Sequence, residues 1–398
     1  MKSDNFIIMP KAFVGFDALV PFVVCLKEYT DCRVHCIFLN KQQYEQFLRI
    51  PVYKDIIESY TYTYVLLESG SLVQSIKDTF SILFYFLLSI KISIFTFGNQ
   101  TSEKKFYRVI KLLSLIKGKY YVIPNYSAPM PWSFFEGYYL NALMSPSIRT
   151  LLGKDKGSKF NAYVDKNLIG TLLLQSNYDN KRANLFGSPK QRLYMGYYKL
   201  YKPWSNLILN NTMYESDKLK NASECIVVVA KRSGRYFFDS DDVYMELLNE
   251  TINSIRKYYP STLIVFKPKA FKVIESNDWV EPYIESLGDK SIVVDYTPLA
   301  FTASKTIFAV FNIASTAYFD FVIQNVPCIE HSRYGENYLS INKGGSYMQE
   351  YGATKTETKQ ELNNAIELVK NQSLSKMKPD DLKSKISHTE NYDSFANF

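Results

Sequence analysis

The chain has 398 residues, 46% of them hydrophobic, and a formal net charge of +8 at pH 7. This length and apolar content suffice for two domains with full cores. The moderate basic excess suggests an anionic partner. Because no zinc-finger, homeodomain or ribonucleoprotein pattern is present, we expect a phosphorylated substrate or an anionic membrane surface, and no nucleic acid.

Five cysteines lie mostly inside apolar runs, which is typical of buried free thiols in a reducing compartment. The N-terminal segment lacks the apolar core of a signal peptide. Residues 79–90, "TFSILFYFLLSI", carry no charge but fall short of the roughly 18 to 20 residues that span a bilayer. We expect a helix that is either buried or lies on the surface, and we favour a buried one.

Residues 1–125 alternate between apolar strands and helices. We expect strands at 6–10, 33–40, 62–67, 91–97 and 120–125. We expect helices at 16–29, with Pro21 in its first turn or at a kink, at 41–50, up to about residue 90, and at 102–118. This alternation predicts a parallel sheet that is covered on both faces.

Residues 126–222 lose the alternation, and we expect helices and loops there, forming an interdomain region. The alternation restarts afterwards. We expect strands at 225–232, 262–269, 290–296, 307–312 and 327–329. We expect helices at 242–259, 273–287, 297–304, 358–371, and from near Ser315 to before Pro327.

The predicted fold class is therefore α/β, with two Rossmann-like domains whose parallel sheets face a central cleft. The expected parts are an N-terminal Rossmann-like domain (1–125), the interdomain region (126–222), a C-terminal Rossmann-like domain (223–377) and a loose polar tail (378–398). Ligands of open parallel sheets bind beyond the carboxyl ends of the strands, so we expect the site residues in the loops that follow the strands.

Two basic loops follow strands of the second half. Lys231, Arg232 and Arg235 flank a Ser-Gly turn, and Lys267 and Lys269 flank Pro268. Arginine binds phosphate or carboxylate in bidentate fashion, and lysine at a strand end is a plausible phosphate ligand. The alternative is a solvated basic loop and surface lysines.

A pair of hydroxyls, Ser315 and Thr316, stands where a buried strand turns into a helix. Such residues cap helices, and a helix N-terminus can also hold an anion. His331 closes the following strand, where it could bind ribose, base or phosphate, or be a satisfied surface histidine.

The second half resembles, over about residues 223–335, the donor-binding domain of two-Rossmann-domain (GT-B) glycosyltransferases. Bacterial members that use CMP-activated acidic sugars, sialic acid or Kdo, carry a basic-Pro turn and later a Ser-Ser or Ser-Thr pair that opens a helix. Here "KPK" (267–269) and "ST" (315–316) occupy the matching places.

The resemblance implies a glycosyltransferase that moves a sugar, of the CMP-Kdo or CMP-sialic-acid type, to a surface glycan such as an O-antigen, a capsule or a lipooligosaccharide. It implies a cytoplasmic enzyme of polysaccharide or lipopolysaccharide biosynthesis, with peripheral contact to the inner face of the membrane as an option. The alternatives are a UDP-sugar-dependent transferase, a nucleotide-sugar epimerase, and a non-catalytic nucleotide- or glycan-binding module.

The candidate catalytic carboxylates are Asp17, Glu136 and Asp239. Asp17 follows the first strand and either caps a helix or deprotonates an acceptor hydroxyl. Glu136 has aromatic neighbours that could raise its pKa. Asp239 opens the acidic run 239–242, which helix capping largely explains. We favour Asp17 by a small margin.

Amide and phenol side chains at strand ends of the first half suit the hydroxyls of an acceptor sugar. They are Asn99, Gln100, Asn125 and Tyr126. No P-loop, dinucleotide GxGxxG, GxSxG or HExxH motif is present, and no Asp-x-Asp sits in a convincing metal-binding loop. We therefore expect no cofactor and no metal, with basic residues and helix dipoles stabilising the leaving nucleotide.

Overall fold

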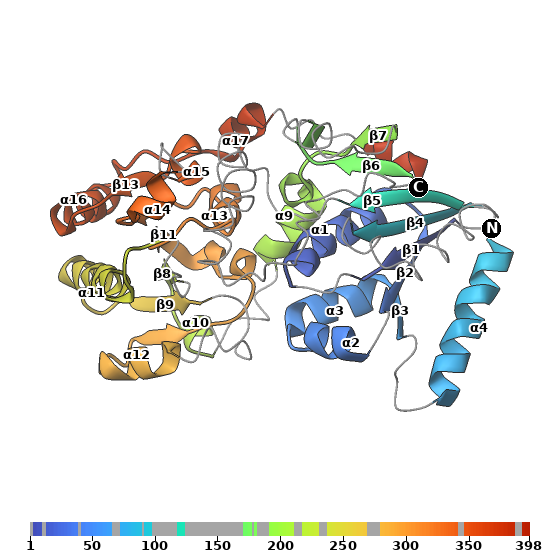
Figure 1. Ribbon diagram of the computed structural model, residues 1–398, viewed down its shortest axis with the longest axis horizontal. Coiled ribbons are helices and arrows are strands. Elements are labelled where there is room, and N and C mark those ends of the chain that lie inside the picture. The colour runs from blue at the N-terminus through green and yellow to red at the C-terminus, as the bar shows by residue number, and fades with distance from the viewer. Residues whose placement is uncertain are drawn as a thin grey trace. The chain divides into compact units, whose positions relative to one another are not determined.

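The computed structural model describes residues 3–9, 13–38, 41–65, 72–89, 91–97, 118–123, 170–176, 179–180, 191–210, 217–230, 237–268, 279–340, 346–386 and 392–398. The chain forms two compact units (Figure 1). The first comprises Met1–Pro129, Asn161–Leu207 and Lys383–Phe398, and the second Met130–Phe160 and Ile208–Leu382. Each unit is a parallel sheet with helices, as the alternation of the sequence predicts.

The first unit contains a seven-stranded sheet in the order β3-β2-β1-β4-β5-β6-β7, with every neighbouring pair parallel. Its strands are β1 (Asp4–Ile8), β2 (Arg33–Phe38), β3 (Tyr62–Val65), β4 (Ile92–Phe97), β5 (Gly118–Ile123), β6 (Thr171–Leu174) and β7 (Gln191–Tyr194). Most residues of the inner strands are apolar and nearly all are buried, because a parallel sheet is covered on both faces.

The described helices of this unit that precede residue 211 follow its strands along the chain. They are α1 (Phe13–Tyr29), α2 (Lys41–Leu48), α3 (Pro51–Tyr60), α4 (Leu72–Leu88), the 3-10 turn η3 (Tyr198–Leu200) and α9 (Lys202–Asn210), whose last residues belong to the second unit. Pro21 lies in the interior of α1, beyond its first turn. Pro51 opens α3, a position where its missing N–H costs no hydrogen bond.

The second unit contains a six-stranded sheet in the order β10-β9-β8-β11-β12-β13, again wholly parallel. Its strands are β8 (Cys225–Val229), β9 (Leu263–Lys267), β10 (Ile292–Val294), β11 (Thr306–Phe311), β12 (Cys328–His331) and β13 (Thr354–Thr356). Its helices are α10 (Asp217–Lys220), α11 (Asp241–Tyr258), α12 (Val280–Ser286), η5 (Leu299–Phe301), η6 (Ala303–Lys305), α13 (Tyr318–Ile323), α14 (Glu336–Leu339), α15 (Tyr347–Glu350), α16 (Lys359–Lys370) and most of α17 (Pro379–Lys385).

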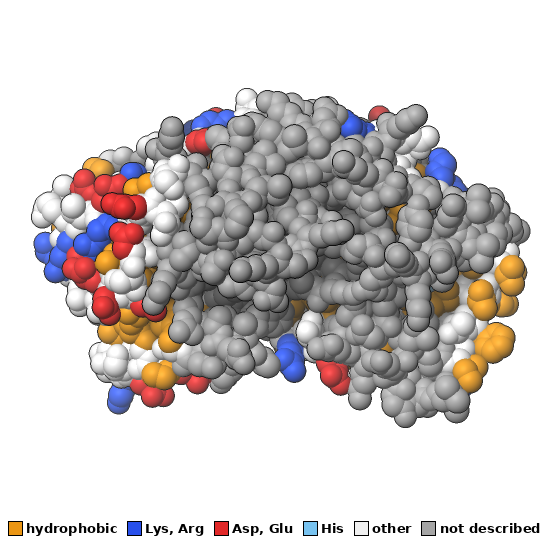
Figure 2. All heavy atoms as spheres, viewed as in Figure 1, with side chains coloured by type: hydrophobic (Ala, Val, Ile, Leu, Met, Phe, Trp, Pro, Cys, Tyr) orange, Lys and Arg blue, Asp and Glu red, His pale blue; other side chains and the backbone are white. Residues whose placement is uncertain are grey.

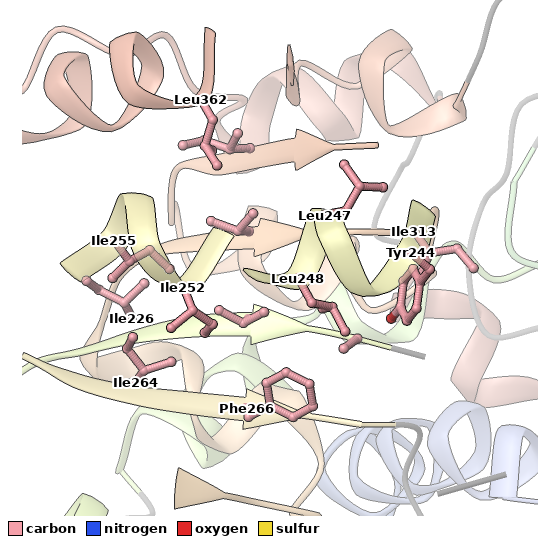
Figure 3. Close-up of a cluster of buried hydrophobic side chains, with 14 of the residues drawn as sticks. Ile226, Tyr244, Leu247, Leu248, Ile252, Ile255, Ile264, Phe266, Ile313 and Leu362 are labelled. Carbon is pink, nitrogen blue, oxygen red and sulfur yellow. The ribbon is translucent and has the colours of Figure 1, made fainter. Parts of the chain in front are cut away.

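One face of the second sheet is sealed by α11 and α16. Leu247, Leu248 and Ile252 of α11 pack on strand residues such as Ile264 and Phe266 (Figure 3). Ser240 caps α11 by accepting a hydrogen bond from the Val243 N–H, and Thr358 and Glu361 form a reciprocal capping box at α16.

Three sequence expectations need correction. Residues 126–222 are not only helices and loops, since β6 and β7 extend the first sheet from within this range. The tail at 378–398 forms α17 and a 3-10 helix (η7, Tyr392–Asn397) where it is described, because it buries Leu382 and Ile386 at α17 and Phe395 and Phe398 at η7. The apolar helix α4 is not buried, because six of its large apolar side chains are exposed.

The segment 392–398 returns to the first unit, where Phe395 and Phe398 are buried. The ring of Phe398 lies 5.0 Å from that of Phe95 and 4.8 Å from that of Tyr121. The ring of Phe395 lies 6.3 Å from that of Phe22 on α1. These contacts complete the aromatic cluster on one face of the first sheet.

Candidate functional site

The strand order of the second sheet reverses between β8 and β11, with β9 and β10 on one side and β12 and β13 on the other. In open parallel sheets, the crevice beyond the carboxyl ends at such a reversal is the preferred ligand site. The last residue of β8, Val229, pairs with the last residue of β11, Phe311. The loops that follow these two strands in sequence therefore start side by side.

The turn after β11 carries Ser315 and Thr316, both half-buried. The Ser315 hydroxyl accepts a hydrogen bond from the Ala317 N–H at 3.3 Å, while α13 begins only at Tyr318. Among the described residues, the Thr316 hydroxyl has no hydrogen-bond partner. Ser315 thus stabilises the turn, and the helix begins three residues later than expected. Anion binding here stays a prediction.

A buried network of hydrogen bonds connects this turn to Glu330 on β12. The Ala314 N–H donates to the Tyr334 hydroxyl at 2.8 Å, and this hydroxyl donates to Glu330 Oε1 at 2.6 Å. Gln349 donates to the other carboxylate oxygen at 3.0 Å. Burial raises the pKa of the Glu330 carboxyl, and these hydrogen bonds only partly oppose the rise. The only sequence signal for this network was an acidic residue at the end of an apolar strand.

Lys267 ends β9, but its side chain is buried rather than presented at the surface. Its ammonium donates to Asp295 Oδ2 at 2.8 Å, to the Thr297 carbonyl and to the Thr302 hydroxyl. Burial alone would raise the pKa of the Asp295 carboxyl, yet the Lys267 ammonium holds it below its usual range. Neither of the two sequence interpretations, a phosphate ligand or a surface lysine, matches this internal ion pair.

His331 is also buried, at the end of β12. Its Nε2 lies 3.1 Å from Glu250 Oε2 and its Nδ1 lies 3.0 Å from the Thr356 hydroxyl. Glu250 also accepts a hydrogen bond from Arg333 at 3.0 Å. Burial lowers the pKa of His331. The histidine is therefore satisfied by its neighbours, but inside the domain and not on its surface.

Asp239 is exposed and contacts the start of α14. Its Oδ1 accepts a hydrogen bond from the Glu336 N–H at 3.2 Å. A Cβ atom on Gly335 would lie 2.3 Å from the same oxygen. Helix capping therefore still explains this region, but the cap of α11 is Ser240, and Asp239 accepts a hydrogen bond from the first residue of α14.

Asp17 lies on α1 in the first unit and has two strong partners. The Lys199 ammonium is 3.0 Å from both carboxylate oxygens, and the Tyr53 hydroxyl donates to Oδ1 at 2.7 Å. Lys199 is almost fully buried, while the Asp17 side chain is 18% exposed. The carboxylate therefore keeps an accessible edge. Its partner Lys199 is 182 residues away in sequence, so no local pattern could have found it.

The remaining predicted site residues lie outside the described part of the chain. They are Asn99, Gln100, Asn125, Tyr126, Glu136, Lys231, Arg232, Arg235 and Lys269. Within the residues that are described, no three His, Cys, Asp or Glu side chains come together as a metal-binding group.

The fold confirms the expected class, α/β with two Rossmann-like parallel-sheet domains of the GT-B type. No protein-family model matches the sequence, and no curated protein does. The similarity to known proteins is therefore one of structure.

Three solved structures illustrate this similarity. TcCGT1 in complex with UDP superposes with a TM-score of 0.52 at 10% identity, over 100% of this chain and 98% of that one. Phytolacca americana UGT2, complexed with UDP-2fluoro-glucose and pterostilbene, gives 0.50 at 14% identity, over 100% and 98%. A candidate UDP-N-acetylglucosamine 2-epimerase from Listeria monocytogenes gives 0.50 at 11% identity, over 100% and 94%.

Proposed function

We propose that this protein is a glycosyltransferase that binds a nucleotide-sugar donor on its second domain, at the reversal between β8 and β11. The observation that carries the proposal is the Ser315–Thr316 turn, which follows β11 directly beside the end of β8. In sequence, β8 leads into Lys231, Arg232 and Arg235. Hydroxyls, backbone N–H groups and guanidinium groups are the donors that recognise a diphosphate.

The donor proposed first is a UDP-sugar. Two of the structures with this fold hold UDP or a UDP-sugar, and the third is a candidate epimerase of UDP-N-acetylglucosamine. The CMP-sugar donor implied by the sequence resemblance is the competing option. Lys267 and His331 are left out of the donor site, because both are engaged inside the domain.

The acceptor is proposed to bind the first domain, whose sheet reverses its order between β1 and β4. Asp17 follows β1 in sequence, and Asn99 and Gln100 follow β4. Asp17 is the proposed base for the acceptor hydroxyl. The proposed acceptor is the surface glycan inferred from the sequence, and transfer is proposed to need no divalent ion.

The test is nucleotide binding by titration calorimetry and thermal unfolding, with UDP, UDP-sugars, CMP and CMP-sugars compared. UDP is expected to bind most tightly. The double variant Ser315→Ala/Thr316→Ala should weaken binding at least about tenfold, since two donors to phosphate are lost. Ser373→Ala, an exposed hydroxyl after α16, is the matched control. Unchanged affinity in a folded double variant would contradict the proposed site. Tighter binding of CMP than of UDP would favour a CMP-sugar as the donor.

Metal dependence is tested with EDTA in the transferase assay. Unchanged turnover is expected, whereas loss that magnesium or manganese restores would contradict a metal-free transfer.

An epimerase is the second candidate function, suggested by the Listeria monocytogenes structure. Incubating the protein with a UDP-sugar but no acceptor discriminates the two. A new sugar epimer in the NMR spectrum would identify an epimerase. Binding without any turnover, with or without acceptors, would leave a nucleotide-binding module.

A further inference from the structure

The helix α4 carries an apolar stripe on its outer face. The side chains of the stripe and their exposed fractions are Ile76 (47%), Phe80 (69%), Leu83 (46%), Phe84 (58%), Leu87 (71%) and Leu88 (50%). Their spacing of three and four residues places them on one side of the helix. Figure 2 shows hydrophobic side chains gathered on the margin of the molecule where Figure 1 shows α4.

The last two turns of α4 pack on the first sheet through the side opposite the stripe. Phe86 is buried in the core of that unit. The Ser89 hydroxyl, just past the helix, hydrogen-bonds to the carboxylate of Asp4 on β1. The Arg33 guanidinium lies 4.9 Å from the centre of the Tyr85 ring. These contacts hold the C-terminal half of the helix on the sheet and leave the apolar stripe exposed.

Six large, contiguous apolar side chains are more than an isolated protein usually displays, and such a patch marks an interaction surface. The described helices include none that is long and apolar enough to cross a bilayer. A helix of this kind that cannot span a membrane can still lie in its interface, with the apolar face among the acyl chains.

Basic residues are frequent in the sequence that contains and follows the stripe. Lys77 lies on α4 itself and is exposed, and Lys91 follows the helix beside Lys119, which is exposed on β5. The stretch 77–119 contains eight basic residues, Lys77, Lys91, Lys104, Lys105, Arg108, Lys111, Lys117 and Lys119, against the acidic Asp78 and Glu103. This local balance of +6 accounts for most of the net charge of +8.

We propose that the outer face of α4 inserts into the surface of an anionic lipid membrane and docks the first domain there. An apolar stripe, with Lys77 exposed on the same helix and further basic residues following in the sequence, has the two features that drive interfacial binding to anionic lipids. The same face of a second copy would bring like charges such as the two Lys77 side chains toward each other, which disfavours a dimer through this face. The inference goes beyond the proposed function, because it uses no residue of the donor site.

The experiment is co-sedimentation of the full chain with phosphatidylcholine vesicles that contain about one third phosphatidylglycerol. The wild type is expected to bind them, to bind pure phosphatidylcholine more weakly, and to be released by salt. Phe80→Gln/Leu87→Gln should lower the partition coefficient at least about tenfold, because two of the most exposed apolar side chains are removed. Leu368→Gln, an exposed leucine on α16, is the matched control and should bind like wild type.

Thermal unfolding verifies that each variant is folded, and nucleotide is left out so that donor binding cannot influence the result. A wild type that stays in the supernatant would overturn the proposal, and so would a double variant that binds like wild type. Sedimentation equilibrium without lipid tests whether the outer face of α4 instead binds a second copy of the chain. A monomer supports membrane docking, whereas a dimer that the double variant dissociates would assign the face to a second copy and overturn the proposal.

Discussion

At the scale of single residues, Asp17 combines an ion pair with an accessible carboxylate edge. We predict that Asp17→Asn lowers kcat at least about 100-fold while nucleotide affinity is retained, because a general base is lost and the donor site is untouched. Steady-state kinetics and calorimetry measure the two quantities. Lys199→Met is the matched variant, since it breaks the same ion pair but keeps the carboxylate.

Equal activity losses in Asp17→Asn and Lys199→Met would mean that Asp17 acts through the structure and not as the base. Asp239→Asn, at an exposed position in the second domain, should leave turnover largely intact. If instead that variant is inactive but binds nucleotide, the catalytic carboxylate lies on the donor side.

The buried ion pair of Lys267 and Asp295 should contribute to the stability of the second unit. Lys267→Met should lower the free energy of unfolding by about 3–5 kcal/mol, because a buried carboxylate is left without its counter-ion. Urea denaturation measures the change. Lys355→Met, which breaks the exposed pair with Glu357, should have a far smaller effect. A second change, Asp295→Asn in the Lys267→Met background, should recover part of the loss, and no recovery would argue against the ion pair as the cause.

The buried carboxyl of Glu330 should make the stability of the protein depend on pH. Its folded-state pKa is raised by burial above the ordinary 4.5, so between these two values the folded state holds a proton that the unfolded state has lost. Stability must therefore fall as pH rises through this window, and the penalty is complete above the folded pKa. We predict that wild type loses stability relative to Glu330→Gln as pH rises from 4 to 8, measured by chemical denaturation. A difference that does not change with pH would contradict this.

At the scale of elements, the contact between the start of α11 and the start of α14 depends on a glycine. Gly335 has an ordinary φ of −73°, so its role is steric. A Cβ there would lie 2.3 Å from Asp239 Oδ1 and 2.8 Å from the Asp239 nitrogen. Gly335→Ala should cost about 1–3 kcal/mol of stability, measured by denaturation. Adding Asp239→Ala should restore only part, since the clash with the backbone remains, and a Gly335→Ala protein as stable as wild type would refute the close contact.

The sequence predicted most strands and long helices, because long apolar runs and helical spacing are strong signals. It missed β6 and β7, which are four residues each, and β7 ("QRLY") is only half-buried at the sheet edge. It also missed α3, although Pro51 marks its start. The prediction that α4 is buried failed because hydropathy measures how apolar a helix is, and not whether other parts of the protein cover it.

Site residues were predicted less well than elements. Strand-end positions placed Ser315 at the right edge of the sheet, because the carboxyl ends of parallel strands share one edge. The same rule does not predict whether a side chain at a strand end faces the ligand site or the interior of the domain. Lys267 and His331 sit at strand ends too, yet partners distant in sequence, Asp295 and Glu250, hold them inside the domain.

At the scale of the whole molecule, the first unit depends on residues from the far end of the sequence. We predict that Phe398→Ala lowers the stability of this unit by about 3–5 kcal/mol, because a large buried aromatic contact is removed. Hydrogen exchange should speed up in α1 and β4 but not in β8 and α11. Exchange that rises equally in both units would show that the two units unfold together.

This connectivity has a consequence during translation. Residues 1–129 and 161–207 leave the ribosome first, but the aromatic cluster around Phe22 and Phe95 is closed by residues 392–398. At about 5–20 residues per second, roughly 10–40 s pass between the synthesis of residue 207 and that of the closing segment. For that interval the earlier unit holds an open apolar surface, which is a natural target for ribosome-associated chaperones. The unit that is synthesised first is the last to be complete.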